Sequence, residues 1–338
     1  MKIGSIDILK AYLGALELTN SNAFIGTIPV IVNSPEPVSY PGLKFTSTGN
    51  STIAMSKVKS APTVDLKYSL DDGKTWTQWD FSEISLSNGQ SVCFKGQNTT
   101  FATSTYDYNK FVMTGTIAAS GNIMSIIDDG ACTTTTIPAD YCFSYLCKGC
   151  SSLTSAPELP ATTLADYCYQ NMFQYCSSLT TAPALPATRL AYSCYWDMFY
   201  GCTSLTTAPE LPATTLAVYC YCNMFYDCTS LTTAPELPAT TLVNDCYSSM
   251  FARCSKLTTA PELPATKLAT SCYSNMFQDC TKLNYIKCLA TNISASRCTS
   301  GWVSGVAGTG KFVKAASMTK WTRGVNGIPS NWTVQNAA

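Results

Sequence analysis

The chain has 338 residues, of which 46% are hydrophobic and only 12% are charged, and its 21 basic residues balance its 21 acidic ones. Since nucleic acids and anionic membranes attract clustered positive charge, and a spanning helix needs about twenty apolar residues, we expect no nucleic-acid partner and no membrane insertion. The sequence has no histidine, which removes the commonest general base and disfavours the Ser/His/Asp and Cys/His catalytic systems.

Residues 1–40 are predicted to form a separate N-terminal attachment segment. Its pieces "IDILKAYLGALEL" and "AFIGTIPVIV" have β-like character, and the proline-rich "NSPEPVSYPG" is typical of a linker. Asp7, Lys10 and Glu17 interrupt the apolar run of a secretory signal, so we expect no cleavable signal peptide.

Residues 41–131 are predicted to form a β-sandwich domain. They show no repeat, and runs such as "VDLKYSLDDGKTWTQWDF" and "ISLSNGQSVCFKG" contain Asp-Gly and Asn-Gly pairs that favour hairpin turns. The stretch "SLDDGKTW" resembles the Asp-box of sialidases, which in those proteins is a turn remote from catalysis. We interpret it as a structural turn containing Asp71 and Gly73, with Trp76 packed underneath.

Residues 132–300 contain a sequence repeat with a period of 26 residues. The leucine of "SSLT" and its copies recurs at Leu153, Leu179, Leu205, Leu231, Leu257 and Leu283. Repeats of this length are typical of solenoids, in which each unit buries its apolar face against the next one.

Each repeat is predicted to contain a helix followed by a strand. In the pattern C-Y-x-x-M-F-x-x-C, Cys168, Met172 and Cys176 are four residues apart, which indicates a short amphipathic helix. The following "LTTAPELP" is compatible with a short strand that its prolines end. The overall prediction is a mixed, multidomain protein: an N-terminal β module and a β-sandwich, followed by an α/β solenoid.

Two columns of cysteines share the repeat, seven residues in one column and six in the other, out of 18 in the chain. The two cysteines of one predicted helix would lie about 12 Å apart along its axis, beyond the roughly 7 Å that a disulfide permits. We therefore expect reduced, buried cysteines that act as small apolar residues, compatible with assembly in a reducing cytoplasm.

Residues 301–338 are predicted to form a β-rich C-terminal cap. The stretch has β-prone fragments between glycines, and Trp302, Trp321 and Trp332 are suited to cover the apolar end that a stack of repeats exposes.

The repeats "MFQYCSSLT", "MFYGCTSLT" and "MFYDCTSLT" resemble leucine-rich repeats of the BspA-like type over roughly residues 140–300. The order of the modules looks like that of proteins of gut Bacteroidales and of their crAss-like phages. The phage version implies a virion fibre, spike or capsid-attached protein, assembled in the bacterial host cytoplasm and exposed on the particle. It also implies contact with other virion proteins through the N-terminal segment, and a homotrimer by analogy with fibres.

Aromatic residues between the fixed positions of the repeat are candidates for ligand binding. They are Tyr167, Tyr175, Tyr192, Trp196, Tyr200 and Tyr226. Together with nearby amides and carboxylates, such rings suit sugar or protein surfaces, because they bury area at little entropic cost. The alternative is that half of the tyrosines only pack between neighbouring helices.

A glutamate column in the repeat is a weak candidate for metal binding. It contains Glu158, Glu210, Glu236 and Glu262, and Ala184 interrupts it. Calcium bridging by Glu210, Glu236 and Glu262 is one interpretation, and a column of solvated carboxylates is the other. No cofactor or catalytic residue is predicted.

These features predict a non-enzymatic virion protein that adheres to a host surface glycan or protein. A bacterial cell-surface adhesin of the BspA-like type is the alternative, and it would need an export signal. A glycan-degrading enzyme is a third possibility, and it would need an acid/base carboxylate pair, which the sequence does not single out.

Overall fold

The structure is a computed structural model that describes residues 23–25, 28–30 and 39–337. The chain divides into two compact units, Met1–Tyr40 and Pro41–Ala338. In the first unit, β1 (Ala23–Ile25) pairs with β2 (Ile28–Val30) in an antiparallel hairpin. The rest of the predicted attachment segment lies outside the described residues.

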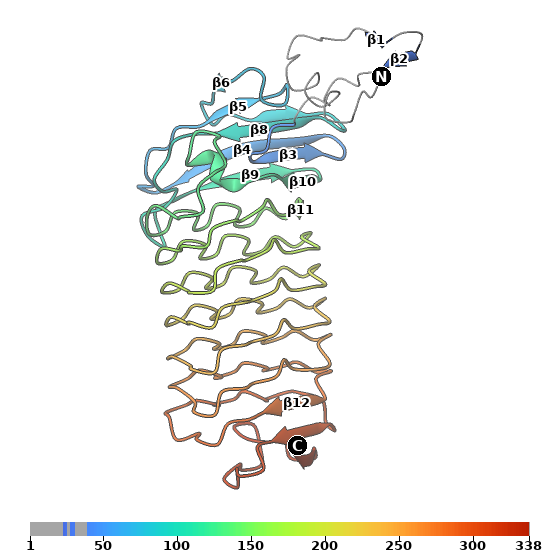
Figure 1. Cartoon of the computed structure of the whole chain (residues 1–338). Coiled ribbons are helices and arrows are strands. Elements are labelled where there is room, and N and C mark those ends of the chain that lie inside the picture. The colour runs from blue at the N-terminus through green and yellow to red at the C-terminus, as the bar shows by residue number, and fades with distance from the viewer. Residues whose placement is uncertain (1–22, 26–27, 31–38, 338) are drawn as a thin grey trace. The chain divides into compact units, whose positions relative to one another are not determined.

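The second unit begins with two β-sheets (Figure 1), one in the order β11-β10-β3-β8-β5-β6 and the other in the order β7-β4-β9. Their strands are β3 (Lys44–Ser47), β4 (Ser51–Val58), β5 (Lys67–Ser69), β6 (Thr77–Gln78), β7 (Ile84–Leu86), β8 (Ser91–Lys95), β9 (Tyr108–Thr114), β10 (Ile117–Ser120) and β11 (Leu153–Ser155). Their neighbours run antiparallel, except that β10 and β11 are parallel. A short 3₁₀ helix, η1 (Ile123–Ile126), follows β10.

An aromatic core joins the two sheets. Alternate residues of β4 are buried, as expected for a strand with one face against a core. The ring of Phe45 on β3 lies 5.1 Å from that of Phe111 on β9. Trp79 packs among these rings. Trp76, which the sequence predicts to pack underneath the turn, is half-buried, and Lys95 Nζ lies 5.1 Å from the centre of its ring.

The turn between β5 and β6 is held by the side chain of Asp71. Ser69 Oγ donates a hydrogen bond of 2.6 Å to Asp71 Oδ1, and the backbone N–H of Thr75 donates one of 2.9 Å to the same atom. These bonds, with the one from Ser69 the strongest, hold the pKa of Asp71 well below its usual range. The carboxylate therefore serves the turn as an acceptor.

The repeats continue the larger sheet. Strand β11, in the first repeat, pairs in parallel with β10. Equivalent residues then form single parallel bridges from repeat to repeat, such as Ser155 with Thr181 and Thr181 with Thr207. The prolines that follow these residues have no N–H to donate, which limits the predicted strand to single bridges in the later repeats. Figure 1 shows the repeats as a stack of similar layers.

The helix predicted in each repeat is wrong: the described residues contain no α-helix, and the segment is a run of β-turns. The N–H of Gln170 donates to the carbonyl of Tyr167, three residues back, at 3.0 Å. The N–H of Tyr169 instead donates to the carbonyl of Cys194 in the next repeat, also at 3.0 Å. The same alternation continues to Cys176, so successive N–H groups take turns in closing a turn and joining two repeats.

A left-handed residue at every fourth position produces this conformation. Tyr167, Asn171 and Tyr175 have φ values of 58°, 56° and 61°. Equivalent positions in other repeats are often Asn, Asp or Gly, the residues that adopt positive φ at least cost. A four-residue period also describes one face of a helix, which is why the apolar spacing alone indicated a helix.

The inward side chains form ladders through the stacked repeats. The rings of Phe173 and Phe199 are 5.6 Å apart and nearly parallel, and those of Tyr169 and Tyr195 are 5.9 Å apart. Both ladders are fully buried, together with the repeated leucine that begins at Leu153. Deleting one such ring to alanine costs about 3–5 kcal/mol in a typical core.

All eighteen cysteines are unpaired, and all but Cys132 are buried, in agreement with their predicted role as small core residues. The second cysteine of each repeat also donates to a backbone carbonyl of the preceding repeat, as Cys202 Sγ does to Phe173 O at 3.1 Å. Burial raises the pKa of the Cys202 thiol well above its usual range, which keeps it protonated and unreactive.

The C-terminal residues close the far end of the stack. Strands β12 (Tyr285–Cys288), β13 (Lys311–Lys314) and β14 (Thr333–Asn336) form a parallel sheet. Trp302 stacks on Tyr273 of the last full repeat and on Trp321, at 6.2 and 5.5 Å between ring centroids. The predicted tryptophan cap is therefore present, and Trp332 is also buried. No segment among residues 39–337 forms a helix of the length and hydropathy needed to cross a bilayer.

A run of turns and a helix predict different effects of substituting residue 249. Ser249 has a φ of 53°, whereas its neighbour Ser248 is not left-handed. We expect Ser249→Gly to be neutral or to stabilise the protein by up to about 1 kcal/mol, and Ser249→Val to destabilise it by about 1–3 kcal/mol. Ser248→Gly is the matched control and should destabilise by about 0.5–1 kcal/mol. Denaturant unfolding measures all three, and equal losses for both glycine variants would indicate a helix instead.

Candidate binding face

Six positions in each repeat differ from copy to copy, and they occur as three pairs. In the unit that begins at Asp166 the pairs are residues 166–167, 170–171 and 174–175, while the sequence between and after them is nearly the same in every copy. These positions lie outside the main hydrophobic cluster, several of them, such as Gln170 and Ala252, are buried, and each pair ends in a left-handed residue. We call this surface, with its equivalents in the other repeats, the variable face.

Three of the predicted binding residues form one aromatic cluster on the variable face. The ring of Tyr192 lies 5.2 Å from that of Tyr167 and 5.8 Å from that of Tyr219, in both cases edge to face. The indole of Trp196 stacks on Tyr219 at 5.7 Å. Tyr141 stacks on Tyr167, so the cluster of five rings extends over several repeats.

The other three predicted residues form a second cluster, at the opposite edge of the variable face. Tyr200 stacks on Tyr226 with centroids 4.7 Å apart, and it meets Tyr175 edge to face at 5.4 Å. Arg253 lies over the ring of Tyr226 and 3.9 Å from Asp227. The hydrogen bond to Tyr226 and the charge of Asp227 raise the pKa of Arg253.

The predicted binding residues are distinct from the tyrosines that pack inside the stack. The buried tyrosines form a separate column, which includes Tyr169 and Tyr195. The predicted ones remain partly exposed, and Tyr175 is 49% exposed. The tyrosines of residues 141–273 therefore occupy one of two places that the sequence period separates.

A polar strip lies between the two aromatic clusters. Its central residue is Asp197, which accepts a hydrogen bond of 3.3 Å from Asn171 Nδ2, and Asp197 Oδ1 has no partner among the described residues. Burial raises the pKa of the Asp197 carboxyl to about 6, although hydrogen bonds from Asn223 and Asn171 and the charge of Lys148 partly oppose the shift. Asp197 is thus the one carboxyl group of the variable face whose raised pKa lies near neutrality.

The glutamate column lies apart from the variable face. Glu158, Glu210, Glu236 and Glu262 are all exposed, and Glu262 pairs with Lys287 Nζ at 2.9 Å. Among the described residues, no group of three or more cysteine, aspartate or glutamate side chains could hold a metal ion. Calcium bridging by Glu210, Glu236 and Glu262 is therefore not supported by a clustered site.

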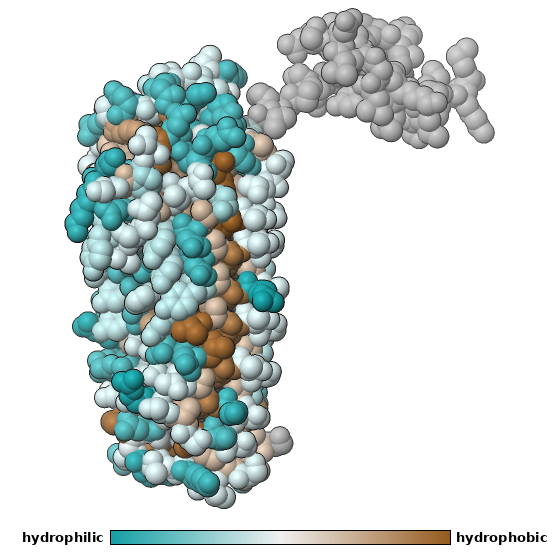
Figure 2. Space-filling view, turned by 90° about the vertical axis from the view of Figure 1, so that its left-hand side faces the viewer, coloured by the Kyte–Doolittle hydropathy of each residue, from teal (hydrophilic) through white to brown (hydrophobic). Residues whose placement is uncertain are grey.

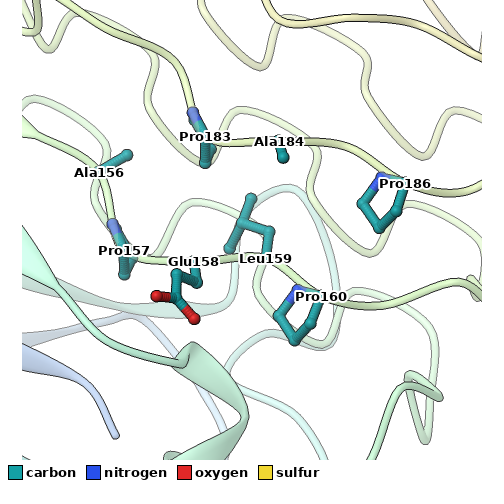
Figure 3. Close-up of a pocket in the computed structure, with 8 residues that line it drawn as sticks. All are labelled: Ala156, Pro157, Glu158, Leu159, Pro160, Pro183, Ala184 and Pro186. Atoms are coloured by element: carbon teal, nitrogen blue, oxygen red, sulfur yellow. The ribbon is translucent and has the colours of Figure 1, made fainter. Parts of the chain in front are cut away.

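A pocket of about 340 Å³ lies where this column is interrupted, because Ala184 leaves space that a glutamate would fill (Figure 3). Its lining is Ala156, Pro157, Glu158, Leu159, Pro160, Pro183, Ala184 and Pro186. In Figure 3 the Glu158 carboxylate points away from Pro183 and Ala184. The pocket is mostly apolar and, apart from Ala184, is built from residues that every full repeat shares.

The surface of the second unit also carries an apolar stripe, which Figure 2 shows running along the unit between more polar flanks. Half-buried apolar side chains recur just before each run of turns, at Leu164, Ala165, Ala191, Ala217, Leu242 and Val243. They pack against the core and separate it from solvent.

The sequence analysis named neither Asp227 nor Arg253 as a site residue. With Gly201 they occupy the left-handed position next to the second aromatic cluster, and Asp197 occupies the middle one. The signal was available in the pairs of variable positions, which recur every four residues. It did not reveal the arrangement, because the same four-residue period also fits one face of a helix.

Comparisons with protein-family models, with curated proteins and with solved structures find no match to this chain.

The raised pKa of Asp197 predicts a specific pH dependence of stability. Because the folded-state pKa lies above the ordinary aspartate value, the ionised carboxylate destabilises the fold, and stability is gained as the pH falls through about 6. We expect Asp197→Asn to raise the unfolding free energy near pH 7 by on the order of 2 kcal/mol, and to remove this gain at acidic pH.

Denaturant unfolding between about pH 7 and pH 4 measures the effect. The exposed Asp279→Asn is the control, and it should retain the wild-type pH profile. Identical profiles for Asp197→Asn and the wild type would show that Asp197 is not perturbed.

Proposed function

We propose that this chain is a structural protein of a phage particle, a fibre, spike or capsid decoration, that binds a host surface glycan or protein. In this proposal the stacked repeats are a BspA-like leucine-rich-repeat solenoid. The fully buried leucine ladder from Leu153 to Leu283 supports this interpretation, together with the resemblance of the repeat sequence. We assign the chain no catalytic activity and no cofactor.

The observation that carries the proposal is the division of each repeat into a constant core and a variable face. The variable positions lie outside the core, so they can change without repacking it. They hold two clusters of aromatic rings with amide, carboxylate and guanidinium groups beside them. Aromatic residues and arginine are enriched in interfaces because they bury a large area at little entropic cost.

Two further features agree with a particle protein. The cysteines are unpaired and buried, which suits folding in a reducing bacterial cytoplasm before release. The first unit, Met1–Tyr40, is compact by itself, and we propose that it contacts other virion proteins. A homotrimer is the assembly that the resemblance to fibres suggests.

Mass spectrometry of purified particles tests this proposal. For a phage that encodes the chain, we expect its peptides in gradient-purified particles at a fixed ratio to the major capsid protein. Disruption of the gene should reduce attachment of the particles to host cells. Finding the chain only in the bacterial envelope, and never in particles, would contradict the proposal and favour a cell-surface adhesin.

A further inference from the structure

One tyrosine of the variable face packs against a glycine of the next repeat. The repeat position occupied by Tyr175 is occupied in the next repeat by Gly201, which is buried and has a φ of 71°. A Cβ atom on Gly201 would lie only 2.6 Å from Cδ1 and 3.0 Å from Cε1 of Tyr175. The Tyr175 ring therefore covers the space that any other side chain at residue 201 would occupy.

This arrangement leaves Tyr175 with an open side. One edge of the ring packs against Gly201, and the ring of Tyr200 lies 5.4 Å away with an interplanar angle of 79°. No parallel ring stacks on Tyr175 among the described residues, in contrast to the pair formed by Tyr200 and Tyr226. The side chain is 49% exposed, so a flat apolar surface faces solvent at a fixed place.

Polar groups border this ring on the side toward the later repeats. Tyr200 and Tyr226 contribute phenol hydroxyls, and their rings stack with centroids 4.7 Å apart. Arg253 and Asp227 follow, 3.9 Å apart, with the guanidinium over the ring of Tyr226. The residues around the ring therefore provide neutral hydroxyl groups, one cation and one carboxylate within a single cluster.

We propose that Tyr175 on Gly201 is the stacking platform of a sugar-binding subsite, and that its ligand is a pyranose unit of a surface glycan. The C–H groups of a pyranose carry partial positive charge and pack on the negative face of an aromatic ring. The hydroxyl groups around the sugar then meet the phenols of Tyr200 and Tyr226, Arg253 and Asp227. The centre of a protein interface is depleted of aspartate, so the carboxylate of Asp227 within this cluster fits a sugar better than a protein surface.

This inference rests on the proposed function and specifies its ligand. It also explains why the repeat changes from tyrosine to glycine at this position. A non-glycine residue at 201 would be strained by its positive φ and would push the ring of Tyr175 away from the surface. Gly201 is therefore a positioning residue, and Tyr175 makes the contact.

Binding to a printed array of purified bacterial capsular and O-antigen polysaccharides, with dextran and mannan included, tests the inference. The full-length chain should be captured by at least one polysaccharide, and titration of that polysaccharide gives the affinity. We expect Tyr175→Ala to weaken binding at least about tenfold, because stacking residues at the centre of a site carry much of its affinity. Tyr175→Phe should bind within about threefold of the wild type, because the ring face is retained.

Two further variants make the test specific. Gly201→Ala leaves Tyr175 in the chain but displaces its ring, so we expect a loss comparable to that of Tyr175→Ala. Tyr106→Ala removes a tyrosine that is 66% exposed in the loop before β9 and lies beneath Lys59, and it should bind like the wild type. Melting temperatures and circular dichroism of all variants exclude unfolding as the cause of a loss.

The outcomes separate this inference from the proposed function. Capture of a polysaccharide with equal affinity by the wild type and a folded Tyr175→Ala would overturn the platform while leaving an adhesive virion protein. Failure of every polysaccharide on the array, with binding to intact host cells retained, would overturn the glycan ligand alone. Absence of the chain from particles would contradict the proposed function itself.

Discussion

Alternating use of backbone N–H groups holds the repeats together. Along the run of turns, one N–H closes a turn on the carbonyl three residues back, and the next N–H crosses to the following repeat. An α-helix would satisfy its N–H groups internally and leave the repeats to associate through side chains alone. Here the backbone itself joins each layer to the next, which fixes the layer spacing and aligns equivalent side chains into ladders.

The ladders and the variable face both follow from this constraint. Because each turn of the run needs a left-handed residue, side chains alternate in pairs between the core and the outer surface. The inward pairs begin with Cys168 and Tyr169 and are nearly constant, since each must stack on its copy in the next layer. The outward pairs contact mainly one another, and they carry most of the differences between copies, such as Tyr175 against Gly201.

The sequence predicted the repeat, its period, the unpaired cysteines and the tryptophan cap, because each of these follows from composition and spacing. It failed on the conformation of the segment from Tyr167 to Cys176, since a four-residue apolar period fits a helix and a run of turns equally well. The decisive information was the recurrence of Asn, Asp and Gly at every fourth position, which favours positive φ. The residues of the two aromatic clusters could be identified from the sequence. Their grouping in space could not, because it depends on the conformation of the turns.

The variable face also differs from the pocket on the proline side of the repeats. Apart from Ala184, that pocket is lined by residues that all full repeats share, and Ala184 stands where the other full repeats have a glutamate. The variable face combines different side chains from several layers. The groups available to a ligand therefore depend on which repeats are neighbours. A stack of this kind can change its ligand by substitution at the outer pairs while its core remains the same.

Exchange of one outer surface for another tests most directly whether the fold is independent of the variable face. The unit at 192–217 would receive the outer residues of the unit at 244–269. The residues replaced are Tyr192, Trp196 and Tyr200, and those supplied at the equivalent positions are Asn244, Ser248 and Ala252, while the left-handed residues Ser193, Asp197 and Gly201 are kept. Denaturant unfolding should show a change within about 1 kcal/mol, as for substitutions outside a core. Loss of cooperative folding, or of several kcal/mol, would show that the outer pairs help to determine the fold and would contradict this account.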